Sequence, residues 1–348
     1  MITVTRWVDE KTTNLEDIEK LLDSPHPNEV PESGTKYINW EIQKVFDKDK
    51  KDVFYGREIT YNYYTFSVDQ IPGGEEISDD GTYTKRGFVI PYFSAGKVRY
   101  IISKNTYAQT LLRKMLFYSG KGEILSNTLE LSGDLFVWLI SKVYGKENTI
   151  SSENEELSDL IIDSIKGFKG DTEDLLAKVS MSGESVMNII SALSFLIESR
   201  NLNQITIALS YRNHMNMEIS LNNRNTIGFD EDKYLGELVQ VPRHEMIATC
   251  ILSLYMEIVP ILLQKYQSDI DLNLWGQGKA TFLSMIRSGL VFIPVLWILS
   301  YLIGLFGIQT SQTIADGIAA AITIPMVVRF LRRMPEDGEE FSNKSGFL

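Results

Sequence analysis

The feature that most constrains this sequence is a run of nineteen residues without a formal charge, at positions 288–306. An α-helix rises 1.5 Å per residue, so about 20 such residues cross a hydrocarbon core of roughly 30 Å. Pro294 does not exclude a membrane span, because transmembrane helices tolerate proline better than soluble helices do. The run predicts a transmembrane helix, and the alternative is a fully buried helix in a soluble core.

A second apolar run follows after a short polar segment. Residues 307–313 (GIQTSQT) predict a turn, and residues 314–330 (IADGIAAAITIPMVVRF) predict a second span. Basic residues flank the two runs and are missing from the turn: Lys279, Arg287, Arg329, Arg332 and Arg333. Cytoplasmic flanks of membrane helices carry an excess of Lys and Arg. We therefore expect a two-helix hairpin, integral to the cell inner membrane, with both termini in the cytoplasm.

The second run has a face suited to self-association in the lipid bilayer. Gly317 and Ala321 lie four residues apart, a spacing that lets helices approach closely. A further set of residues shares one helical face: Asp316, Ala320, Thr323 and Val327. This face either lines an aqueous passage between several copies, or Asp316 is solvated at the outer surface of the bilayer. The small residues predict a homo-oligomer in both cases.

A third apolar segment, residues 246–263, is long enough to cross a membrane. It contains Glu257, Pro260 follows closely, and basic residues lie on both sides. Because carboxylates are rare inside membranes, the segment predicts a buried or interfacial helix of the cytoplasmic part. A third span is the alternative.

The remainder of the chain predicts an α+β fold with an antiparallel sheet. Strand-like runs occur at 59–71, at 88–93 and 98–103 around a Ser-Ala-Gly-Lys turn, and at 204–212 with 214–221. Helical patterns occur at 106–118 (after Asn105 as a cap), 134–144, 157–168 and 184–198. The polar stretch 146–156 is the best linker, which gives four regions: cytoplasmic regions 1–150 and 151–275, a membrane hairpin 276–334, and a polar tail 335–348.

Charge narrows the range of ligands. A net charge of -12 argues against binding of nucleic acid through bulk electrostatics. The densest basic cluster consists of Lys97, Arg99, Lys104, Arg113, Lys114 and Lys121. Three tyrosines, Tyr100, Tyr107 and Tyr118, lie among them and are able to stack on bases. The cluster is either a site for a small nucleotide or a solvated face beside the core.

Catalytic and metal-binding signatures are not evident. The single cysteine, Cys250, cannot form an internal disulfide, and His244-Glu245 lacks the second histidine of a zinc-protease helix. The sequence has no phosphate loop, dinucleotide fingerprint or nucleophile elbow. It therefore predicts no catalytic residue, no metal and no cofactor.

Three functions fit these features. A large cytosolic domain joined to a short transmembrane hairpin resembles the organisation of bacterial abortive-infection and antiphage effectors that depolarise the inner membrane. This resemblance lies in the architecture and implies a sensor that binds a protein partner or small nucleotide and then acts on an oligomeric hairpin. The alternatives are a membrane-tethered binding or scaffold module, and a membrane-bound enzyme of unrecognised class.

Overall fold

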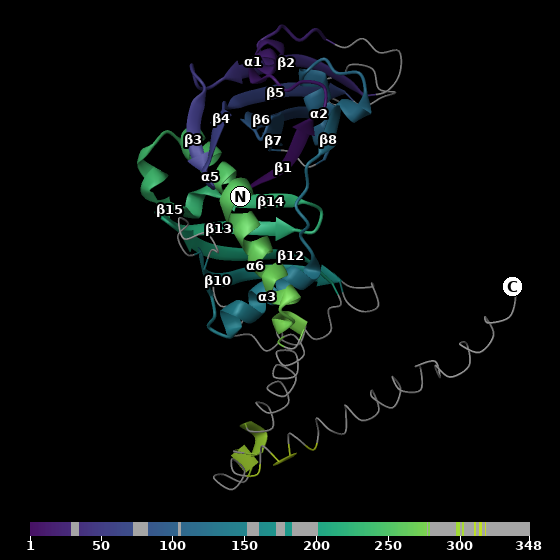
Figure 1. Cartoon of the computed structure of the whole chain (residues 1–348). Helices are drawn as coiled ribbons and strands as arrows, with labels where there is room; N and C mark the ends of the chain where they lie inside the picture. Colours follow the sequence, from purple (N-terminus) through teal and green to yellow (C-terminus); the bar gives the residue numbers. More distant parts are fainter. Residues whose placement is uncertain are drawn as a thin grey trace, which may run out of the picture. The chain divides into compact units, whose positions relative to one another are not determined.

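The computed structural model describes residues 1–28, 35–71, 83–103, 106–151, 160–171, 178–182 and 201–276, with 278, 297–299, 301–302, 310, 313–314 and 317. The chain divides into two compact units. The first comprises Met1–Met187 and Ser199–Trp275, and the second comprises Asn188–Glu198 and Gly276–Leu348. The first unit has a mixed α+β fold with one large antiparallel sheet (Figure 1). The predicted α+β class is thus confirmed, whereas a boundary near residue 150 stays a prediction.

The first strand, β1 (Ile2–Asp9), joins two halves of this sheet. Its start, Ile2–Val4, pairs with β14, and its continuation, Thr5–Val8, pairs with β7. We call the strands on the β7 side the N-terminal half-sheet: β2 (Lys36–Lys44), β3 (Lys50–Phe54), β4 (Arg57–Tyr61), β5 (Tyr64–Ile71), β6 (Tyr83–Ser94), β7 (Lys97–Ile102) and β8 (Ile124–Ser126). The strands on the β14 side form the C-terminal half-sheet: β9 (Thr149–Ile150), β10 (Leu160–Asp171), β11 (Lys178–Ser182), β12 (Asn201–Tyr211), β13 (His214–Asn222), β14 (Thr226–Asp230) and β15 (Leu235–Gly236).

Both predicted hairpins are confirmed. Strands β6 and β7 pair in register around Ala95 and Gly96, whose φ angles of 49° and 74° allow a tight two-residue turn. Strands β12 and β13 pair with a single register shift near their turn. The predicted strand 59–71 is instead divided into β4 and β5. Asn62 causes the break, because its buried side chain donates to the carbonyl oxygen of Phe46 and accepts from the N–H of Tyr63.

One predicted helix is wrong. Residues 157–168 were expected to be helical, but residues from Leu160 onward form β10, which pairs with β12 along its length. Two register shifts, between Ile162 and Ser164 and between Ile165 and Gly167, put buried side chains at 162, 165 and 168. A spacing of three imitates the period of a helix, although it arises from β-bulges.

The remaining helical predictions have different outcomes. Helix α3 (Gly133–Tyr144) is confirmed and begins after Ser132, whose side chain accepts from the N–H of Leu135. Helix α2 (Ala108–Met115) is shorter than predicted and has no side-chain cap. Asn105 and the predicted helix 184–198 lie outside the described residues.

The longest helix spans Arg243 to Asp271 in three parts: α5 (Arg243–Ser253), the π-helical turn η6 (Leu254–Ile258) and α6 (Val259–Asp271). Pro260 explains the π turn, because it has no N–H to donate to the preceding turn and its ring crowds that turn. Among the described residues, this is the one helix long and apolar enough to cross a membrane, and 78% of its most apolar window is buried inside the protein. The predicted buried helix at 246–263 is confirmed.

Helices cover both half-sheets. Helix α1 (Leu15–Leu22) and α2 bury their apolar faces on the N-terminal half-sheet, in a core that includes Tyr64, Tyr100 and Leu111. Helix α3 contacts β10, β12 and α6 over the C-terminal half-sheet (Figure 1). The π turn ties the halves together through Glu257, which is 1% exposed. Its carboxylate accepts from the N–H of Tyr55 at 2.8 Å and lies 3.2 Å from Nη1 of Arg212.

The second unit contains most of the predicted membrane hairpin, which lies largely outside the described residues. Its described residues at 297–299, 301–302, 310, 313–314 and 317 are helical. Thr310 and Thr313, which the sequence assigns to a turn, are among them. Large apolar side chains in the first predicted span are exposed: Trp297, Ile298, Tyr301 and Leu302. The two-helix hairpin stays a prediction.

Candidate functional site

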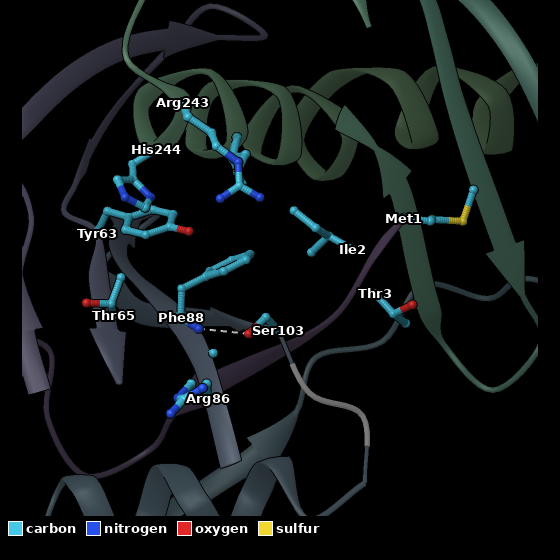
Figure 2. Close-up of a pocket in the computed structure, with 12 residues that line it drawn as sticks. Met1, Ile2, Thr3, Tyr63, Thr65, Arg86, Phe88, Ser103, Arg243 and His244 are labelled. Atoms are coloured by element: carbon cyan, nitrogen blue, oxygen red, sulfur yellow. Dashed lines mark hydrogen bonds between the residues drawn. The ribbon is translucent and has the colours of Figure 1, made fainter. Parts of the chain in front are cut away.

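A cavity of about 590 Å³ opens where the start of β1, the edges of β5, β6 and β7, and the first turn of α5 meet (Figure 2). Residues from all these elements line it: Met1, Ile2, Thr3, Tyr63, Thr65, Arg86, Gly87, Phe88, Ser103, Arg243, His244 and Ile247. We call this cavity the arginine pocket. It lies where the two half-sheets join through β1, so its walls come from segments far apart in the sequence.

Two guanidinium groups line the pocket. Arg243 projects from the first turn of α5 (Figure 2). Its Nε donates to Oε2 of Glu231 at 2.7 Å and its Nη2 to Oε1 of the same carboxylate at 2.5 Å, so this ion pair balances its charge. The pairing raises the pKa of Arg243 and fixes its orientation. Arg86 is exposed on β6 and forms no ion pair with any residue that the structure describes. Its charge helps, after hydrogen bonds from Asn39 and Thr84, to lower the pKa of Asp69.

The aromatic wall beside the arginines is buried. Tyr63 stacks on Phe88 with ring centroids 4.9 Å apart and contacts the ring of His244 at 5.1 Å. Burial raises the pKa of Tyr63 well above its ordinary value, so its hydroxyl group stays protonated. The Nδ1 atom of His244 is buried and has no hydrogen-bond partner in the described part of the chain. Hydrogen-bonding capacity is therefore left over beside the cavity.

Backbone and hydroxyl groups add to this capacity. Helix α5 begins after Pro242, which supplies no side-chain cap. The N–H groups of Glu245 and Met246 donate to the carbonyl oxygen of Pro242. The first two N–H groups of the helix, those of Arg243 and His244, are left for water or a ligand. On the opposite wall, the Ser103 hydroxyl accepts from the N–H of Phe88 at 2.8 Å and retains its own proton to donate.

This arrangement can bind an anion. It combines guanidinium groups, helix N–H groups and a hydroxyl group, and it places no carboxylate on the lining. Among the described residues, no group of three or more His, Cys, Asp or Glu side chains could hold a metal ion.

The described members of the predicted basic cluster contact several different groups. Lys97 pairs with Glu10 at 2.8 Å, and the side chain of Arg99 donates to the carbonyl oxygen of Ser94. Arg113 donates to the carbonyl oxygen of Ser119, in the loop that leads to Lys121, so these two basic residues lie close together. Lys114 lies on the same helix, α2, and Lys104 is outside the described residues.

The tyrosines among these basic residues also have other contacts. The hydroxyl groups of Tyr100 and Tyr118 both donate to the buried carboxylate of Asp9, at 2.5 and 2.9 Å. Tyr107 is exposed and lies under the ammonium group of Lys85. Because two of the three rings are buried, stacking of successive bases has little support here. A nucleotide site at this cluster stays a prediction.

The predicted pore and packing residues are mostly beyond what the structure describes. Gly317 is helical, and a Cβ added to it would meet no atom within 4 Å. Asp316, Ala320, Ala321, Thr323 and Val327 lie outside the described residues. Their roles stay predictions.

No motif in the sequence predicts the arginine pocket. Its two arginines are separated by more than 150 residues, and neither belongs to a local motif. His244 lies in the first turn of α5. The one available signal was Pro242 before a helix without a capping side chain, which leaves N–H groups free.

No protein-family model and no curated protein matches this chain. The features of the chain that bear on its function are therefore the arginine pocket and the apolar C-terminal segment.

Proposed function

We propose that this chain is a membrane-anchored sensor and effector of the bacterial inner membrane, of the membrane-disrupting antiphage type. In this proposal residues 288–306 and 314–330 cross the bilayer as a hairpin with both termini in the cytoplasm. Several copies associate through the hairpins, and the first unit controls them when it binds a ligand.

One observation carries the membrane part of the proposal. In the uncharged run 288–306, Trp297, Tyr301 and Leu302 are 73%, 85% and 69% exposed. Large apolar groups placed together in water are unfavourable, and exposed apolar patches of this kind mark contacts with lipid or protein. The length of the run and the basic residues around it favour lipid.

The arginine pocket supports the sensor part. It lies at the first turn of the helix Arg243–Asp271, which ends five residues before Gly276 and 17 residues before the uncharged run that begins at Ser288. A ligand held at the first turn is thus bound to the same helix that precedes the membrane segment. A shift of this helix provides a direct physical route from ligand to hairpin.

Alkaline carbonate extraction tests the anchor. The full chain should stay with the membrane, and Leu302→Arg should move much of it into the supernatant, because an arginine in the middle of a span costs about 2.5–3.5 kcal/mol. Leu235→Arg is the matched control, since Leu235 is also largely exposed but lies in the first unit. If both variants extract like the natural chain, the first span is not in the bilayer.

A membrane-potential dye in expressing cells tests the effector. Depolarisation should follow expression of the natural chain together with its trigger, and Asp316→Asn should change the size of the response if Asp316 lines a passage. Cells whose potential never changes would favour the second candidate, a membrane-tethered binding module. The arginine pocket favours that candidate as much as the first, because ligand binding alone does not require a pore.

A further inference from the structure

We propose that the arginine pocket binds a phosphate monoester, with Arg86, Arg243 and the first turn of α5 holding the phosphate group. This inference rests on the proposed function, because the phosphate compound would be the signal that the sensor detects. It assigns a ligand class to a site that the sequence did not reveal.

The donor set of the pocket fits a phosphate better than a carboxylate. A phosphate monoester carries about -1.5 to -2 charges at pH 7 and three acceptor oxygens. The Arg86 guanidinium supplies a cation without an ion-pair partner in the described chain. The charge of Arg243 is balanced by the Glu231 carboxylate, and its remaining N–H groups supply further donors. A single carboxylate would leave part of this donor set unused.

The first turn of α5 lines the same cavity and adds N–H donors. The N–H groups of Arg243 and His244 begin a helix without a side-chain cap, and such ends bind phosphate oxygens. The Ser103 hydroxyl and the Thr65 hydroxyl line the facing wall. Donors thus come from both sides of the cavity, as a tetrahedral group with several oxygens requires.

The volume of the cavity and its apolar lining residues indicate what the organic part of the ligand is like. A volume of about 590 Å³ lies within the usual range for small-molecule sites and exceeds the needs of a bare phosphate ion. Ile2 and Ile247 offer apolar contact beside the arginines. The ring of Tyr63 contacts the rings of Phe88 and His244. We assign recognition to the phosphate group, because the guanidinium, hydroxyl and N–H donors of the lining are suited to its oxygens.

The phosphate group could belong to a soluble metabolite or to a lipid headgroup, because the proposed hairpin keeps the protein at the membrane. The shared chemistry is a terminal phosphate on an organic group. Separate probes distinguish these two sources.

The test uses the full chain in detergent micelles, with calorimetric titration of glycerol 3-phosphate and AMP as soluble probes. Glycerol and adenosine, which lack the phosphate, serve as matched probes at equal ionic strength. Nanodiscs with and without phosphatidic acid represent the lipid source. We expect saturable binding of at least one phosphate probe and none of its matched partner.

Two arginine variants locate the site. Arg86→Ala should weaken binding at least tenfold, and it should fold normally because Arg86 is exposed and without an ion pair in the described chain. Arg224→Ala is the control, because Arg224 is an exposed guanidinium that lines a separate cavity of about 320 Å³. Circular dichroism melting checks that both variants are folded.

Three results would overturn the inference: no phosphate probe binds, adenosine binds as tightly as AMP, or Arg224→Ala loses binding while Arg86→Ala retains it. Carbonate extraction of membranes from cells that express the same chain reports on the anchor independently. If the chain stays in the membrane fraction but binds no phosphate probe, this inference alone is refuted. If the chain binds a phosphate probe but is released into the supernatant by carbonate, the membrane proposal is refuted.

Discussion

Two of the apolar segments of this chain, residues 246–263 and 288–306, differ in how far their described side chains are exposed. Residues 246–263 belong to a helix that is largely buried in the first unit. Residues 288–306 include Trp297 and Tyr301, which are among the most exposed large apolar side chains described. Apolarity by itself therefore does not distinguish a core helix from a membrane span.

The two segments differ in whether they contain a charged residue. Glu257 interrupts the first segment, and protein groups from two separate turns, Tyr55 and Arg212, meet its carboxylate. The second segment has no charge to accommodate. A charged residue inside an apolar helix is thus a sign that protein surrounds it, because lipid offers a carboxylate no partner.

Leucine truncations should give the largest contrast between the segments. Leu252→Ala removes a side chain with 0% exposure and should lower the free energy of unfolding of the first unit by about 3 kcal/mol. Leu302→Ala should change it by less than about 0.5 kcal/mol, because that side chain is exposed. Urea unfolding in detergent, followed by tryptophan fluorescence, measures both. Equal losses would mean that Leu302 belongs to a protein core.

Removal of the charge in the buried segment should have the next largest effect. Glu257→Ala leaves the N–H of Tyr55 without its acceptor and Arg212 without its partner, and should cost about 2 kcal/mol. The cost stays below that of a fully buried pair, because the Arg212 side chain is 37% exposed and water can solvate it.

Lys51→Ala is the control for this measurement. It breaks an exposed pair with Glu58, at 3.1 Å, and should change the stability by less than about 1 kcal/mol. If Glu257→Ala is equally mild, Glu257 is not needed to hold the buried helix.

Lowering the pH should produce the smallest change in the stability of the first unit. Burial lowers the pKa of His214, whose Nδ1 lies 2.7 Å from the hydroxyl group of Tyr234. The unfolded chain then binds a proton at a higher pH than the folded one does. The stabilisation is complete above pH 6.5, the ordinary pKa of histidine, and is lost as the pH falls through the lowered folded pKa.

His214→Gln keeps a hydrogen-bonding group at this position but does not titrate. Thermal melting from pH 7.5 to pH 5 should show a shallower loss of stability for this variant than for the natural chain. Parallel curves for the two proteins would contradict a role for His214 in the acid response.

Sequence patterns predicted the parts of the fold that depend on neighbouring residues. The turn at Ala95 and Gly96 is local, and both predicted hairpins are present. Strand β10 was missed because its bulges change the spacing of buried residues from two to three. The segment is a strand because it pairs with β12, and the residues of β10 alone do not show that this partner exists.

The arginine pocket depends even less on local pattern. Arg86 and Arg243 line one cavity because β1 connects the half-sheets and α5 returns to that connection. The predicted basic cluster has members that are close in sequence. Among its described members, Lys97 and Arg99 contact groups other than those that hold Arg113, and the site stays a prediction.

The position of β1 has a consequence for biosynthesis. Val4 pairs with Ile227, so the start of this strand waits for more than 200 residues of translation before its partner β14 exists. At about 5–20 residues per second, the nascent chain carries an unpaired strand edge for roughly 10–45 s. Such an edge invites pairing with other chains. A chaperone that covers it during translation would therefore be expected to raise the yield of folded protein more than one that acts after release.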